Sequence, residues 1–92
     1  MSEKILTLHP EGKQGVNIEK VKYDQMRVEL LNIIRSKGQV SFSDLSASAK
    51  EQLAGKFEGS IGWYMTTVKL DLEARGEIER IPGSRPQLIR LK

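Results

Sequence analysis

Few side chains in this sequence are suited to covalent chemistry. The chain has one histidine, His9, and no cysteine, which excludes a thiolate nucleophile, a cysteine-ligated metal and a multi-histidine metal site within one chain. His9 lies in a turn beside Pro10, without the nucleophile and orienting group that a catalytic base needs. Glu77 and Glu79 would share a strand face, where an exposed strand edge explains them. We therefore expect no catalytic residues, no metal and no cofactor.

The glycines between Gly55 and Gly62 suggest a phosphate-binding loop only superficially. The stretch reads G-K-F-E-G-S-I-G. A P-loop needs four residues between its glycines, followed by Gly-Lys and then Ser or Thr. A glycine-containing turn between two helices explains the stretch better.

The composition is that of one soluble globular domain. Of the 92 residues, 29% are charged and 38% are hydrophobic, which are ordinary proportions. No apolar run approaches the roughly 18 residues of a membrane span, and the N-terminus lacks the apolar core of a signal peptide. We therefore expect a cytoplasmic protein with no membrane partner. The net charge is only +3, but the segment from Arg80 onward is basic and contains no acidic residue.

Three helices are predicted by the spacing of apolar residues and by their end signals. Ser43 and Ser60 have the side chain of an N-cap, and Gly38 stands where a left-handed residue would end the first helix. Apolar residues recur three and four positions apart between these signals. The expected helices are Val21–Lys37, Asp44–Ala54 and Ile61–Arg75. In the third helix, Asp71 and Arg75 can form an i,i+4 pair.

Short strands are expected around these helices. A five-residue loop, Pro82–Pro86, would join two strands into a hairpin that pairs with a stretch between the first two helices. The apolar run Ile5–Leu8 is either an edge strand or an arm, and the turn residues His9–Gly15 follow it. We divide the chain into an arm and turn at residues 1–19 and a domain at residues 20–92. The strands of the expected three-stranded sheet are Gln39–Phe42, Glu77–Ile81 and Gln87–Leu91.

The element order and one segment resemble a known superfamily. Residues 72–83, L-E-A-R-G-E-I-E-R-I-P-G, are similar to the end of a recognition helix running into the wing of bacterial winged-helix proteins. This resemblance covers residues 23–92. It implies an α+β fold with a three-helix core, a helix-turn-helix and a C-terminal β-hairpin wing. It also implies duplex DNA binding by a small transcription regulator, with homodimerisation as one arrangement.

A narrower resemblance covers nearly the whole chain. The sequence is similar to a small family of uncharacterised bacterial winged-helix proteins of about this length, and this likeness implies no activity. It is carried by His9-Pro10, Gly12, Gly15, Lys22-Tyr23-Asp24, Gly59-Ser60, Trp63-Tyr64 and Val68–Gly76.

The third helix would be the reading helix, because a helix in the major groove presents its outward, N-terminal residues to the bases. Ser60 and the free N–H groups at the helix start could hold a phosphate, and Lys69 would lie on the flank of the outward face. Arg85 is near the tip of the expected wing, and Arg90 could contact the backbone. The outward face contains no Arg, Asn or Gln, which is unusual for a DNA reader. The predicted nucleic-acid-binding residues are Ser60, Gly62, Trp63, Thr66, Thr67, Lys69, Arg85 and Arg90.

A protein interface on the same helix is the alternative interpretation. Trp63 and Leu70 would then pack against the N-terminal arm or against a second subunit, because aromatic residues mark protein interfaces as readily as DNA contacts. The fold would serve as a protein-interaction or homodimerisation module without DNA binding. No small-molecule pocket is evident from the sequence. The residues of the alternative interface are Trp63, Leu70, Ile5, Leu6 and Leu8.

Overall fold

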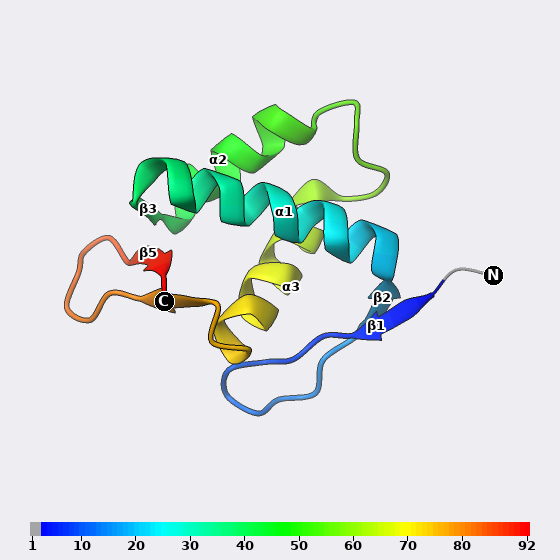
Figure 1. Ribbon diagram of the computed structural model, residues 1–92, viewed down its shortest axis with the longest axis horizontal. Coiled ribbons are helices and arrows are strands. Elements are labelled where there is room, and N and C mark those ends of the chain that lie inside the picture. Colours follow the sequence, from blue (N-terminus) through cyan, green and yellow to red (C-terminus); the bar gives the residue numbers. More distant parts are fainter. Residues whose placement is uncertain (1–2) are drawn as a thin grey trace.

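The chain folds into three helices and two small antiparallel sheets, as the computed structural model shows (Figure 1). The structure describes residues 3–92, so the first two residues of the expected arm lie outside the described residues. The α+β class predicted from the sequence is confirmed. In chain order the elements are β1 (Lys4–Leu6), β2 (Asn17–Glu19), α1 (Lys20–Lys37), β3 (Gln39–Ser41), α2 (Phe42–Leu53), α3 (Ile61–Ala74), β4 (Ile78–Arg80) and β5 (Leu88–Leu91).

The core lies where α1, α2 and α3 meet. Met26, Leu30 and Ile34 of α1 are fully buried, and they recur every four residues as the apolar spacing predicted. The turn between α2 and α3 adds the Phe57 side chain, whose ring packs edge-on against Tyr64 at 5.1 Å. The buried apolar residues contributed by α2 and α3 are Leu45, Ala49, Leu53, Met65, Val68 and Leu72.

A three-stranded sheet closes one side of the helices. Its strand order is β3-β5-β4, with Ile89 of β5 opposite Val40 on one side and Arg80 on the other. Val40 and Ile89 turn their side chains into the core. The expected pairing of the stretch after α1 with the C-terminal hairpin is therefore confirmed. The loop between β4 and β5 projects away from the helices, at the left of Figure 1.

The two predicted N-caps have different outcomes. Ser60 caps α3, because its side-chain oxygen accepts the Trp63 N–H at 3.2 Å. The cap of α2 is Ser41, which accepts the Asp44 N–H at 3.1 Å, so the prediction of Ser43 is wrong. The helix therefore begins at Phe42, which was expected to end the preceding strand.

The residues before α1 form a hairpin. β1 pairs with β2, with Ile5 opposite Ile18, and the intervening residues 7–16 make the connection. Ile18 belongs to the core and Ile5 packs against it, which fixes the hairpin to the body of the domain. We call residues 4–19 the N-terminal hairpin. Ile5 and Leu6 of the expected arm are thus in a strand, and Leu8 lies in the connection.

Within residues 3–92, no helix combines the length and the apolar character needed to cross a bilayer.

Candidate binding surface

The first turn of α3, with Thr66 in the second, is the part of that helix whose side chains are exposed. Trp63 is 48% exposed and Thr66 is exposed, whereas Gly62 is half-buried. The Thr66 hydroxyl donates to the Gly62 carbonyl at 3.0 Å, which leaves its oxygen lone pairs available to an outside donor. The Trp63 indole stands edge-on against Tyr64 at 4.9 Å, so one part of the ring is packed and the other faces solvent. Ser60, Gly62, Trp63 and Thr66 therefore lie together, as the sequence predicted.

Two lysines that were not predicted lie near this turn. A Cβ placed on Gly62 would meet the Lys50 Cε of α2 at 3.7 Å, so the Lys50 stem runs beside the start of α3. Lys56 is exposed in the turn that leads into the same helix. The sequence signal that could have identified them is their position as cations shortly before the expected reading helix.

A hollow separates the second half of this face from the N-terminal hairpin. It has a volume of about 190 Å³. Trp63 and Leu70 line it on the side of α3, and Leu8 and Val16 line it on the side of the hairpin, so the packing of Trp63 and Leu70 against the arm stays a prediction. We call this feature the hairpin–α3 hollow. Its lining residues include Leu8, Gln14, Val16, Trp63, Thr67 and Leu70.

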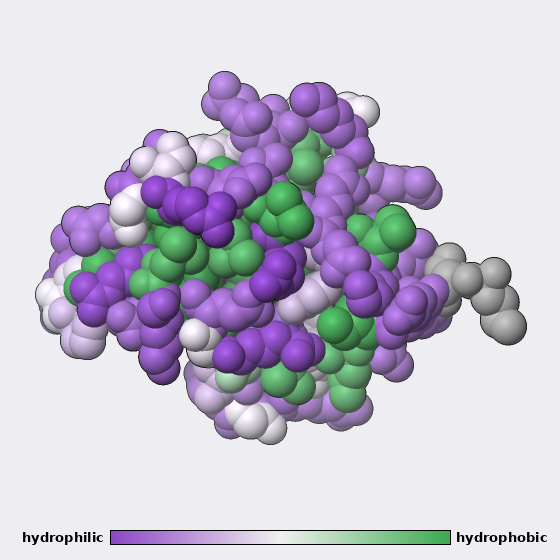
Figure 2. Space-filling view, viewed as in Figure 1, coloured by the Kyte–Doolittle hydropathy of each residue, from purple (hydrophilic) through white to green (hydrophobic). Residues whose placement is uncertain are grey.

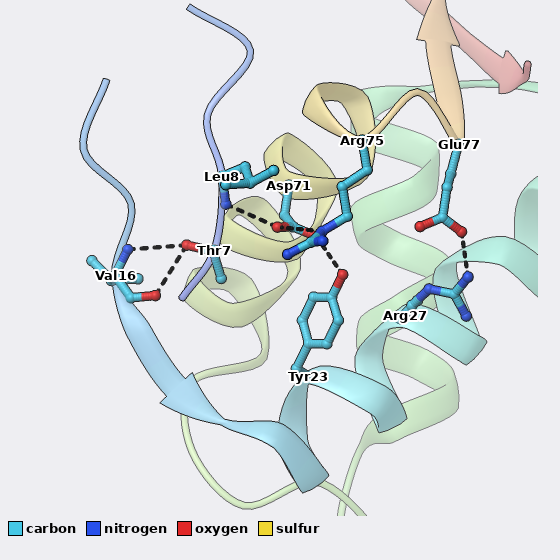
Figure 3. Close-up of polar contacts among 8 residues, drawn as sticks. All are labelled: Thr7, Leu8, Val16, Tyr23, Arg27, Asp71, Arg75 and Glu77. Atoms are coloured by element: carbon cyan, nitrogen blue, oxygen red, sulfur yellow. Dashed lines mark hydrogen bonds and ion pairs between the residues drawn. The ribbon is translucent and has the colours of Figure 1, made fainter. Parts of the chain in front are cut away.

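A buried carboxylate attaches the hairpin to α3 (Figure 3). Asp71 is completely buried, and its Oδ1 accepts the Leu8 backbone N–H at 2.8 Å. The Tyr23 hydroxyl of α1 donates to the same carboxylate. The Arg75 Nε lies 3.0 and 2.9 Å from its two oxygens, which confirms the expected i,i+4 pair. Burial and the hydrogen bond to Asp71 raise the pKa of Tyr23 far above its ordinary value.

The connection of the hairpin is closed by contacts between its first and last residues, next to the strand ends. The Thr7 Oγ1 donates to the Val16 carbonyl at 3.2 Å and accepts the Val16 N–H at 3.0 Å. Gly15 packs so closely that a Cβ there would lie 1.7 Å from the Thr7 carbonyl oxygen. No side chain larger than hydrogen fits at Gly15 while the hairpin keeps this shape.

Lys69 does not lie on the exposed flank of α3 that the sequence predicted. It is 6% exposed, its Nζ is 2.8 Å from the Glu73 carboxylate, and it sits 5.4 Å from the centre of the Phe42 ring. Because α2 begins earlier than expected, Phe42 covers this side of α3. The structure therefore removes Lys69 from the predicted contact surface.

Glu73 is shared between Lys69 and a second cation. The Arg80 guanidinium holds both of its carboxylate oxygens, at 3.0 and 3.1 Å. Burial raises the pKa of Glu73, but Arg80 and Lys69 together outweigh that effect and leave the pKa below its ordinary value. These contacts tie the C-terminal half of α3 to β4.

Of the two arginines predicted to bind DNA from the C-terminal hairpin, one is paired with a carboxylate and the other is not. Arg90 donates from its Nε to Glu79 across the sheet at 2.7 Å, so fewer of its N–H groups are free to bind a ligand. Arg85 is exposed in the projecting loop and has no ion-pair partner among residues 3–92.

The part of the chain that the structure describes contains no cluster of three or more His, Cys, Asp or Glu side chains arranged to hold a metal ion. A family model described as a family of unknown function (DUF6958) matches residues 4–89. No curated protein and no solved structure matches the chain. The matched range contains both the N-terminal hairpin and the three helices, so these parts belong to one family unit.

Proposed function

The chain belongs to DUF6958, a family of unknown function, and we propose from its geometry that it is a winged-helix domain that binds duplex DNA and acts as a small bacterial transcription regulator. The element order supports the fold. In this proposal α2, the connection at residues 54–60 and α3 are the helix-turn-helix, and β4 and β5 are the hairpin of the wing. β3 pairs with β5, which joins the wing to the helices.

The first turn of α3 is the observation that carries the DNA proposal. Trp63 in this turn and Thr66 in the next are exposed near the N-terminus of the helix, the end that reads base edges in helix-turn-helix proteins. Lys50 and Lys56 flank this turn and are placed to contact phosphates, which supply most of the affinity for DNA. Arg85 on the wing loop supplies a separate contact to the backbone or the minor groove.

Trp63 fluorescence provides the direct test. The chain has one tryptophan, so a change in emission has a single source on the proposed contact face. We expect a saturable change when mixed-sequence duplex is added at about 50 mM salt, weakening as salt is raised. An unchanged emission, with no retardation of the duplex in a gel, would contradict DNA binding.

Charge variants locate the contacts. Lys50→Ala and Arg85→Ala should each reduce the slope of log affinity against log salt by about 1. Lys37→Ala is the matched control, because Lys37 lies at the end of α1 beside Gln52, on the other side of α2 from Lys50. A slope that Lys50→Ala and Arg85→Ala leave unchanged would remove α2 and the wing from the contact surface.

An interface with a second copy of the chain is the second candidate. Large apolar side chains are exposed on and beside the N-terminal hairpin, including Leu6 (54%), Leu8 (43%) and Val16 (40%). Figure 2 shows apolar surface over this hairpin, at the lower right of the view. Exposed apolar patches and unpaired strand edges are both features of protein contacts, and β1 is an edge strand. Ile5 packs against the core and so contributes less than the alternative interface expected.

Light scattering coupled to size-exclusion chromatography separates the two candidates. If the hairpin face forms a dimer, Trp63→Ala and Leu6→Ser should each convert the dimer to a monomer. Val21→Ser is the matched control, because Val21 is an exposed valine at the start of α1. A wild-type chain that is monomeric across the measured concentrations would contradict self-association.

A further inference from the structure

The proposed reading face of α3 lacks the side chains that pair best with base edges. Its exposed and half-buried members are Trp63, Thr66 and Thr67. Arg and Lys pair with guanine, and Asn and Gln pair with adenine, each through two hydrogen bonds. Thr can form single hydrogen bonds or touch a thymine methyl group, which discriminates less between bases.

The N-terminal hairpin brings a carboxamide to this face. Gln14 is exposed and lines the hairpin–α3 hollow together with Trp63 and Thr67. Its side chain has no hydrogen-bond partner among the described residues, so both ends of the amide are available. Neighbouring Lys13 pairs with Glu11 at 3.4 Å, but both side chains are mostly exposed, so this ion pair contributes little to holding the loop in place.

We propose that Gln14 is a specificity-determining residue, and that it reads a base beside the position occupied by the first turn of α3. An adenine in the major groove is the best match, because its N6 donor and N7 acceptor complement the oxygen and nitrogen of a carboxamide. This inference rests on the proposed DNA binding and adds the residue that selects the sequence.

The position of Gln14 is fixed by the contacts of the hairpin. Gly15 follows it and lies against the Thr7 carbonyl, and the next residue, Val16, is bonded to Thr7 three times. On the other side of the connection, the Leu8 N–H is held by buried Asp71 of α3. The backbone that carries Gln14 is therefore tied to the reading helix itself, and such preorganisation reduces the entropy lost on binding.

Selection from a pool of randomised duplexes tests the inference. The wild-type chain, Gln14→Ala and the control Gln52→Ala are compared, because Gln52 is an exposed glutamine on α2 that lies outside the hollow. We expect the wild type and Gln52→Ala to enrich adenine at one position. Gln14→Ala should lose that preference, a change of about tenfold or more, while its affinity for mixed-sequence duplex stays within about twofold.

A second variant moves Gln14 without removing it. Gly15→Ala places a methyl group against the Thr7 carbonyl, so the hairpin must open and the carboxamide must shift. We expect the same loss of adenine preference, with circular dichroism confirming that the helices remain. Gly12→Asn is the control, because a Cβ there meets nothing within 4 Å and asparagine tolerates its positive φ.

The outcomes test the role of Gln14 separately from the proposed DNA binding on which it rests. A wild type that binds duplex without base preference, or a Gln14→Ala variant that keeps the preference, overturns the role of Gln14 and leaves DNA binding standing. A wild type that binds no duplex overturns both.

Discussion

Asp71 joins three parts of the chain through one carboxylate. It receives the Leu8 N–H from the N-terminal hairpin, the Tyr23 hydroxyl from α1 and the Arg75 guanidinium from its own helix. A buried charge is tolerated when its hydrogen-bonding capacity is filled, as it is here. The residue therefore acts as a structural centre beside the binding surface.

Replacing Asp71 should lower the free energy of unfolding more than replacing any exposed carboxylate. Asp71→Ala leaves the Tyr23 hydroxyl and the Leu8 N–H without their acceptor, and each unsatisfied buried group costs about 1–3 kcal/mol. We expect the free energy of unfolding in urea to fall by about 3 kcal/mol. Asp24→Ala, which removes an exposed pair with Lys20, should cost less than about 1 kcal/mol. Equal losses in the two variants would contradict the central role of Asp71.

Single residues show how far local reasoning reaches. The Asp71–Arg75 pair was predicted because the two residues are four positions apart on a helix. The other two partners of Asp71, Leu8 and Tyr23, lie 63 and 48 residues away, and no local pattern signals them. Lys69 was placed on the surface because a helical wheel contains no information about Phe42, which covers it.

Among the elements, α2 offers a test of where a helix begins. Ser41 and Ser43 both have the side chain of an N-cap, and the structure gives the role to Ser41. Ser41→Ala should lower the free energy of unfolding by about 1 kcal/mol, because the Asp44 N–H loses its acceptor. Ser43→Ala should have an effect within about 0.5 kcal/mol. The reverse order in chemical denaturation would show that the helix starts after Phe42.

The elements that the sequence predicted best are those with local causes. α1 and α3 follow from repeated apolar spacing and from the end signals Gly38 and Ser60. The N-terminal hairpin was left open as a strand or an arm, because β1 and β2 have three residues each and show too little alternation to reveal their pairing. Its shape depends on Gly15 meeting Thr7, a contact that exists only after folding. Gln14 was missed for the same reason.

At the scale of the whole molecule, stability should decline at alkaline pH. The pKa of Tyr23 is raised above its ordinary value of 10.0 in the folded chain, so the unfolded chain loses this proton first. The stabilisation is complete below pH 10 and decreases as pH rises toward the folded pKa. Urea unfolding between pH 8 and 11 should show this decline, and Tyr23→Phe should reduce its slope above about pH 10. Tyr64→Phe, at a tyrosine packed between Phe57 and Trp63, is the control.

Acid should weaken the fold through Glu73. Its pKa is lowered in the folded chain, so its ion pairs with Lys69 and Arg80 stabilise the fold above the ordinary value of 4.5. This stabilisation is lost as pH falls through the folded pKa. Glu73→Gln should be less stable than the wild type at pH 7, and the difference should shrink between about pH 5 and pH 2. A difference that stays constant over that range would contradict the assignment.

The bond between Leu8 and Asp71 also bears on the order in which the chain acquires its structure during synthesis. The two residues are 63 positions apart. At a translation rate of about 5–20 residues per second, Leu8 is added to the chain roughly 3–13 s before Asp71. An isolated two-stranded hairpin is marginally stable in water, and during that interval the N-terminal hairpin lacks the contact with α3 that holds it. We expect the N-terminal hairpin to be among the last parts of the nascent protein to settle, although it is the first to be made.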